Sequence, residues 1–145
     1  DGEGLVADLG PALVEQAARA FGSSSVVVSI DVRRRVLGGS RVAIRGATVM
    51  TKWTPLDFAK RMADAGAGEL LINSVERDGT GRGYDIELLR SVAGSVSVPV
   101  IACGGARTVD DLGAAVKAGA SAAAAGSMVG FFSTAGHWIS VVFCR

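Results

Sequence analysis

The sequence predicts an α/β fold in which helices cover a parallel β-sheet. Three observations predict it. Short β-branched or apolar runs alternate with segments of helical periodicity, the helical segments open on proline, threonine and aspartate, and glycines separate the two kinds of segment. Repeated strand–helix units of this length join into parallel sheets through right-handed crossovers.

The first part of the chain predicts one helix, one strand and one hairpin. Pro11 predicts a helix start and Gly22 predicts its end. The run SVVVSI at residues 25–30 is nearly all β-branched, so we expect a buried parallel strand that ends at Asp31. Residues 36–53 hold glycines between short apolar pieces and predict a hairpin excursion.

The second part predicts three more strand–helix units. Residues 54–57, TPLD, predict a capped helix start, because threonine caps, proline occupies the first turn and aspartate reaches back. The remaining expected elements are a helix end at Gly66, strands at 70–72, 98–102 and 121–125, a helix at 85–92, and a helix that opens at Thr108 and stops near Gly119.

Four parallel strands cannot close a βα barrel, which needs eight. We therefore expect a (βα)4 half-barrel that forms one domain over residues 1–145, with its core at about 10–132 and an atypical tail at 133–145. Apolar segments in the tail either replace a final helix or patch the open seam. An open flavodoxin-like sheet is the alternative, although its edge strands would need cover. A half-barrel predicts pairing with a second copy or with a missing half.

Composition narrows the classes of function. The chain has 145 residues, of which 49% are apolar, and its 15 basic and 14 acidic residues leave a charge of +1. This balance argues against a nucleic-acid partner or a polyacidic substrate. The two cysteines are far apart and form no metal or disulfide pattern, so we expect no metal, no cofactor and a reduced, cytoplasmic setting. No signal peptide and no membrane span is expected either.

Carboxylates and glycines follow the predicted strands, where the ligands of parallel α/β folds bind. Asp31 can serve as a general acid or base, and the alternative is an ion pair with Arg33 or Arg34. Asp78 and Gly79 open a glycine-rich loop, and the alternative is a simple turn with an Asx hydrogen bond.

Glycines after the next two strands predict a phosphate site. Gly104-Gly105 and Gly126-Ser127 lie one βα unit apart, and glycine N–H groups can hold an anion. Glu69, at the start of its strand, lies at the opposite end, where a solvated charge is the ordinary interpretation.

Four segments in order resemble the cyclase subunit of imidazole glycerol phosphate synthase, the HisF family. They are SIDVRRR (29–35), GAGELLINSVERDGTGRGYD (66–85), VPVIACGGA (98–106) and AGASAAAAGSM (118–128). The similarity covers about residues 10–132 and corresponds to the C-terminal half of that TIM barrel. Asn73 stands where these cyclases usually carry threonine.

The resemblance implies a lyase-type cyclase that takes ammonia from a glutaminase subunit and joins it to a phosphorylated aminoimidazole precursor. Imidazole glycerol phosphate and an aminoimidazole carboxamide ribotide are the implied products. Asp31 would be one of two catalytic aspartates and Asp78 a second site carboxylate. The implied phosphate ligands are Asp78, Gly79, Gly105, Gly126 and Ser127, and Glu69 would lie at the ammonia entrance.

The other catalytic aspartate and the other phosphate site belong to the half that this sequence lacks, so we expect the isolated chain to be inactive. One alternative is a HisF-like component that channels ammonia to a sugar amidotransferase. The other is a non-catalytic half-barrel that assembles or binds phosphate.

Overall fold

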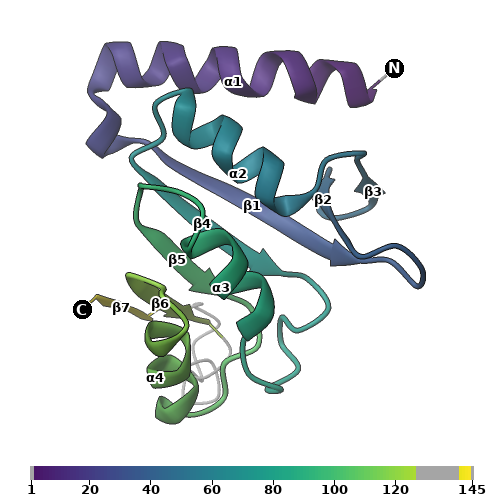
Figure 1. Ribbon diagram of the computed structural model, residues 1–145, viewed down its shortest axis with the longest axis vertical. Helices are drawn as coiled ribbons and strands as arrows, with labels where there is room; N and C mark the ends of the chain where they lie inside the picture. Colours follow the sequence, from purple (N-terminus) through teal and green to yellow (C-terminus); the bar gives the residue numbers. More distant parts are fainter. Residues whose placement is uncertain (1, 127–140, 145) are drawn as a thin grey trace, which may run out of the picture.

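The computed structural model describes residues 2–126 and 141–144. Its strands form one sheet in the order β3-β2-β1-β4-β5-β6-β7, and α2, α3 and α4 lie on the same face of it (Figure 1). The elements in chain order are α1 (Gly2–Phe21), the 3-10 turn η1 (Ser23–Ser25), β1 (Val27–Arg34), β2 (Ser40–Ile44), β3 (Val49–Met50), α2 (Pro55–Asp64), β4 (Glu69–Ser74), α3 (Ile86–Ala93), β5 (Val100–Cys103), α4 (Val109–Lys117), β6 (Ala122–Ala125) and β7 (Val141–Cys144).

The centre of the sheet is parallel, as predicted. Strands β1, β4, β5 and β6 run in the same direction, and a helix connects each of the last three to the strand before it. This is the strand–helix order of a TIM barrel, and the chain has the arrangement of part of one. The carboxyl ends of the four strands therefore lie along one edge, together with Asp31 and the loop that holds Asp78.

Antiparallel strands flank this parallel centre on both sides. β2 and β3 form the hairpin predicted within residues 36–53, and β2 pairs with the second half of β1. This pairing extends β1 to Arg34, so the prediction that the strand ends at Asp31 is wrong. On the other side, β7 pairs with β6, and part of the apolar tail thus covers the β6 edge as a strand.

The start of α1 also differs from the prediction. The helix begins at Gly2 and continues through Pro11. Proline removes one helical hydrogen bond, but its fixed φ is compatible with a helix, so the same residue suits the interior of this helix as well as a first turn. The two threonine caps are confirmed. The Thr54 hydroxyl accepts from Asp57 N at 3.1 Å, and Thr108 forms a capping box with Asp111.

Helices pack against one face of the sheet, and among the described residues the other face carries only a small apolar cluster. Along β4, buried and partly exposed side chains alternate, and Leu70 and Ile72 pack with the helices in the main core. The opposite face carries a smaller apolar cluster of Ile101, Ala122 and Ala124, with Leu71 packed against it. In a closed barrel this second face would line the interior.

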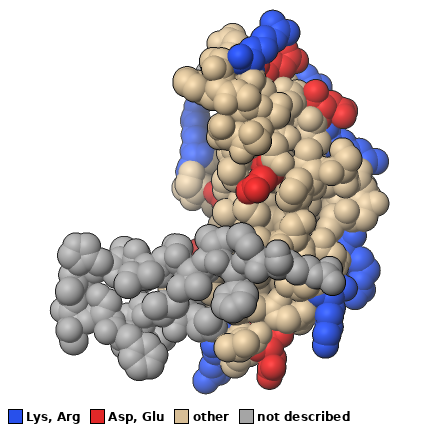
Figure 2. All heavy atoms as spheres, turned by 90° about the vertical axis from the view of Figure 1, so that its left-hand side faces the viewer, with Lys and Arg blue, Asp and Glu red and all other residues tan. Residues whose placement is uncertain are grey.

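Basic side chains do not gather in a single patch on the face seen in Figure 2, where they lie around the outline. This agrees with the balanced charge of the sequence. Within the described residues, no helix has the length and apolar character needed to cross a membrane.

Candidate functional site

Three side chains form a row across the open face near the carboxyl ends of the strands. Asp31 on β1 lies opposite Asn73 on β4, and Asn73 lies opposite Cys103 on β5. Residues in register on neighbouring strands point to the same face. The Asn73 amide donates a hydrogen bond of 2.9 Å to Asp31 Oδ1, which orients the carboxylate. The row places an acid–base candidate at the rim of the sheet.

The alternative interpretation of Asp31, an ion pair with Arg33 or Arg34, is wrong. Arg33 Nε lies 3.2 Å from a Glu76 carboxylate oxygen, and Arg34 lies 3.8 Å from Glu87. Alternation along the strand separates Arg34 from Asp31, because residues three apart point to opposite faces. Asn73 is instead the hydrogen-bond partner of Asp31.

Asn73 is the residue of the candidate site whose contact with Asp31 the sequence did not predict. Its Oδ1 atom is buried without a hydrogen-bond partner among the described residues. A Cβ atom at Gly104 would lie 2.7 Å from this oxygen, so the glycine makes room for the amide. The sequence places Asn73 near the end of the next parallel strand after Asp31. Only the register of β1 with β4 shows that the two residues lie opposite each other.

The loop after β4 presents Asp78 at the same edge. Asp78 is exposed, and its carboxylate makes no hydrogen bond to any other described residue, so nothing supports the Asx-turn interpretation. The turn is held by main-chain bonds instead, with Arg77 N and Asp78 N both donating to Ser74 O. Gly79 has a φ of 71°, and a Cβ there would meet nothing within 4 Å. A ligand can therefore approach the backbone at Gly79.

The glycine pair after β5 has a packing role. Gly104 and Gly105 are buried with φ of 85° and 107°, and a Cβ at Gly105 would lie 2.4 Å from Gly83 O. Gly83 N donates to Gly105 O at 2.8 Å, so the loops after β4 and β5 touch directly. After β6, Gly126 is exposed and a Cβ there would meet no atom of the described residues within 4 Å, whereas Ser127 lies outside the described residues.

The Cys103 thiol lies within the electrostatic influence of both carboxylates. Burial raises the pKa of the Cys103 thiol, the Asp78 carboxylate raises it further, and Asp31 adds a smaller contribution in the same direction. A backbone hydrogen bond from Gly104 opposes these effects. Both carboxylates thus act electrostatically on one thiol, which this environment keeps protonated and unreactive as a nucleophile.

Tyr84 ties the loop after β4 to β6. Its hydroxyl donates to Ala124 O at 2.9 Å, and the side chain is buried. Burial, followed by the influence of Cys103 and Asp111, raises the pKa of Tyr84 to about 12. The phenol therefore stays a neutral donor, and its hydrogen bond connects the loop after β4 to strand β6.

Glu69 lies at the other end of the same face. It is the first residue of β4, and strand alternation puts it on the side of Leu71 and Asn73. No ion pair to Glu69 occurs within the part of the chain that the structure describes. The open face thus runs from a carboxylate at the amino end to Asp31 at the carboxyl end.

Comparison with known proteins gives one consistent result. Residues 4–134 match the family described as histidine biosynthesis protein. The chain is 47% identical over 109 residues to the imidazole glycerol phosphate synthase subunit HisF of Synechococcus sp. (strain CC9311). The aligned region covers 75% of this chain and 41% of the relative.

Two further HisF subunits are similar to a comparable degree. That of Alkaliphilus metalliredigens is 42% identical over 119 residues, covering 81% of this chain and 47% of its own length. That of Metallosphaera sedula is 47% identical over 121 residues, covering 83% of this chain and 48% of its own length. The chain spans less than half the length of these relatives.

Proposed function

Since this chain belongs to the histidine biosynthesis protein family, we propose that it supplies the carboxyl-terminal half of a HisF-type cyclase barrel. The observation that carries the proposal is the hydrogen bond by which Asn73 orients Asp31 at the strand ends, where Asp31 and Asp78 both act electrostatically on Cys103. A carboxylate fixed in orientation, with a second one nearby, suits proton transfer to and from a substrate.

In this proposal the two ends of the open face have different roles. At the carboxyl end, Asp31 acts as general acid and base, Asp78 assists it, and the substrate phosphate binds at Asp78, Gly79, Gly105, Gly126 and Ser127. At the amino end, Glu69 lies at the entrance for ammonia from a glutaminase subunit. The open space at Gly79 and Gly126 supports backbone contact with a phosphate there.

The free edge of β1 supports pairing with the other half of a barrel. β2 pairs only with residues 31–34, so residues 27–30 of β1 have no strand beside them on that side within the described chain. An apolar groove follows this edge beneath α1, and the large side chains Leu13 and Val27 there are 66% and 52% exposed. A strand from an amino-terminal half or a second copy would cover this surface.

A complementation experiment tests the proposed activity. We expect the chain alone to show no cyclase turnover, because one acid–base carboxylate is missing, and the amino-terminal half of the Synechococcus relative to restore it. Asp31→Asn in the restored complex should lower kcat by about 10²-fold or more. Asp64→Asn, an exposed carboxylate on α2, is the matched control.

Turnover by the purified chain alone, or an Asp31→Asn complex as active as the control, would contradict this assignment. Phosphate binding is tested separately by following backbone amide shifts. A response at Gly79, Gly105 and Gly126 is expected, and silence at all three would reject the phosphate site.

The second candidate is an assembly module without catalysis, which the exposed groove along β1 also supports. Sedimentation of the purified chain distinguishes the two. A stable homodimer that no amino-terminal half displaces favours the module, whereas displacement by that half favours the cyclase.

A further inference from the structure

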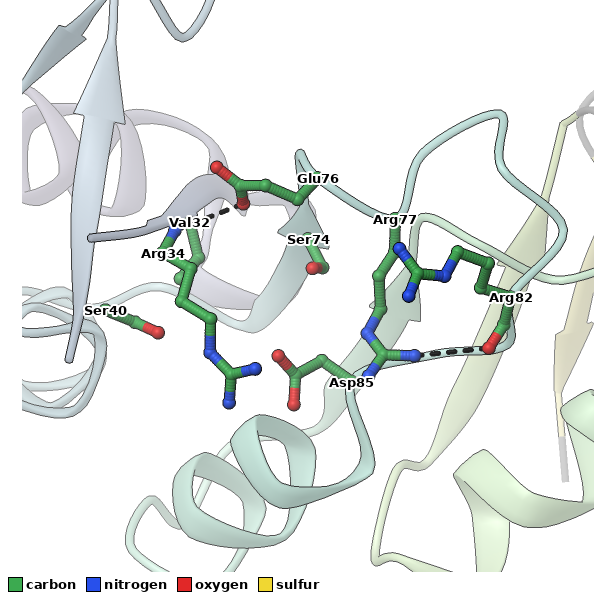
Figure 3. Close-up of a pocket in the computed structure, with 8 residues that line it drawn as sticks. All are labelled: Val32, Arg34, Ser40, Ser74, Glu76, Arg77, Arg82 and Asp85. Atoms are coloured by element: carbon green, nitrogen blue, oxygen red, sulfur yellow. Dashed lines mark hydrogen bonds between the residues drawn. The ribbon is translucent and has the colours of Figure 1, made fainter. Parts of the chain in front are cut away.

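A separate pocket of about 180 Å³ lies on the helix-covered side of the sheet, behind the rim just described (Figure 3). It is bounded by the ends of β1 and β4, the start of β2, the loop after β4 and the start of α3. The lining residues are Val32, Arg34, Ser40, Ser74, Glu76, Arg77, Arg82 and Asp85. None of the residues assigned above to the substrate phosphate belongs to this set.

The charges around this outer pocket do not cancel. Both Glu76 carboxylate oxygens are already bound, one to Arg33 Nε at 3.2 Å and the other to Arg34 N at 3.1 Å. The Arg77 guanidinium donates to the carbonyl oxygens of Arg82 and Gly83, which carry no full charge.

The other two arginines are also weakly neutralised. Arg34 has only an exposed ion pair of 3.8 Å with Glu87, and the Arg82 side chain has no ion pair among the described residues. Asp85 caps α3 at Leu88 N and keeps its charge, so the lining has three guanidinium groups and two carboxylates, and one of these carboxylates, Glu76, is already paired with Arg33 outside the lining. The pocket thus has excess positive charge for an anion.

The hydroxyl of a buried serine provides a second, independent indication of a ligand. Ser74 is only 6% exposed, and in Figure 3 its oxygen points into the space between the arginines. Its side chain makes no hydrogen bond to another described residue. The hydroxyl therefore faces the pocket with its hydrogen-bonding capacity free for a ligand. The first turn of α3 adds its positive dipole end at the same place.

We propose that this outer pocket binds the phosphate group of a small molecule, with Arg34, Arg77 and Arg82 as charged donors and the Ser74 hydroxyl as a neutral one. The pocket has room for about six water molecules at about 30 Å³ each, which suits a phosphate group with a small substituent. The remaining Asp85 oxygen accepts a hydroxyl of that substituent. The site is independent of the proposed cyclase site, because the β-sheet separates Ser74 from the face that bears Asn73.

The test is a titration of the isotope-labelled chain with inorganic phosphate, at ionic strength held constant with chloride, and then with ribose 5-phosphate. We expect saturable shifts of the Ser74, Arg77 and Arg82 amides with both probes. Arg34→Gln combined with Arg82→Gln should weaken binding about tenfold or more, because charge-assisted hydrogen bonds are lost. Arg90→Gln, an exposed arginine on α3 outside the pocket, should leave the affinity unchanged.

Tighter binding of ribose 5-phosphate supports a phosphorylated molecule as the ligand, and equal binding supports the phosphate group by itself. Ser74→Ala should weaken both probes several-fold without changing the fold of the chain. Shifts confined to Gly79, Gly105 and Gly126 would overturn this proposal while supporting the substrate-phosphate site. Shifts that the double arginine variant leaves unchanged would overturn it as well.

Discussion

Replacing Gly105 by alanine separates the packing role of this glycine from a ligand-binding role. A Cβ there would lie 2.4 Å from Gly83 O and 2.9 Å from Arg77 Cβ, in a backbone with φ of 107°. Gly79 is the matched control, because its φ is also positive, at 71°, yet a Cβ would meet nothing within 4 Å. Both substitutions place alanine in an unfavourable positive-φ backbone, but only Gly105→Ala adds a steric clash with the neighbouring loop.

The expected free energies differ clearly. Placing alanine in a left-handed backbone lowers the free energy of unfolding by about 1–2 kcal/mol. Alanine also reduces the conformational entropy of the unfolded chain, which raises the free energy of unfolding by about 0.4–1 kcal/mol. Gly79→Ala should therefore lower the free energy of unfolding by about 1 kcal/mol or less. At Gly105 the neighbouring loop must move by about 1 Å to reach an ordinary contact, which adds about 1–3 kcal/mol of overpacking. The same shift strains the hydrogen bond from Gly83 N, so a total of about 3–5 kcal/mol is expected.

Urea unfolding followed by circular dichroism measures the free energy of unfolding of both variants. Equal m-values would show that both variants expose the same amount of surface on unfolding, so that their free energies can be compared. A difference of at least about 2 kcal/mol supports direct contact between the two loops. If Gly105→Ala is within about 0.5 kcal/mol of Gly79→Ala, the reasoning is refuted. In the same samples, Gly79→Ala should remain folded but bind phosphate more weakly, since its backbone is the open one.

Three further predictions concern ionisation and caps. In a Cys144→Ser background, alkylation of Cys103 should reach half its maximal rate at a pH above the ordinary thiol pKa, and Asp78→Asn should shift that midpoint downward; an unshifted profile would contradict the proximity of the two groups. Tyr84 is the only tyrosine, so absorbance titration should read its pKa directly at about 12, and Tyr84→Phe should cost about 1 kcal/mol through loss of the hydrogen bond to Ala124 O. Hydrogen bonds from backbone N–H groups hold the pKa of Asp111 below its usual value, so this carboxylate stabilises the fold above the ordinary aspartate pKa and stops doing so as the pH falls through its folded-state pKa. Asp111→Ala should therefore lower the free energy of unfolding by about 1 kcal/mol at neutral pH and by less in acid. A loss that does not depend on pH would count against the capping box.

The elements that sequence predicted well are those with strong local signals. The TPLD and TVDD caps and the glycine stops depend on groups within four residues of one another, so local sequence is enough to recognise them. The run SVVVSI does lead into a strand, but the prediction that it is buried is wrong for residues 27–29, because β2 does not pair with this part of the edge and Val27 is 52% exposed. Pro11 misled the prediction because one residue suits two positions in a helix. The end of β1 was misplaced because a strand lengthens wherever a partner continues to pair with it.

The candidate site shows the same division. Its carboxylates and glycines could be chosen from sequence because parallel strands put their carboxyl ends at one edge, whichever strands they are. The hydrogen-bond partner of Asp31 could not be predicted from the sequence, because Arg33 and Arg34 are closer to Asp31 along the chain. Only the pairing of β1 with β4 brings Asn73 beside Asp31. The contact that requires Gly105 likewise depends on a loop more than twenty residues away.

By itself, the sequence determined the kind of fold, the order of its elements and the residue types at the rim, since periodicity and caps act over short distances. Tertiary structure alone decided register, and register decides which side of the sheet each side chain occupies. For this reason Asp31 and Arg34, three positions apart, lie on opposite faces of the sheet, Asp31 in the row with Asn73 and Arg34 in the outer pocket.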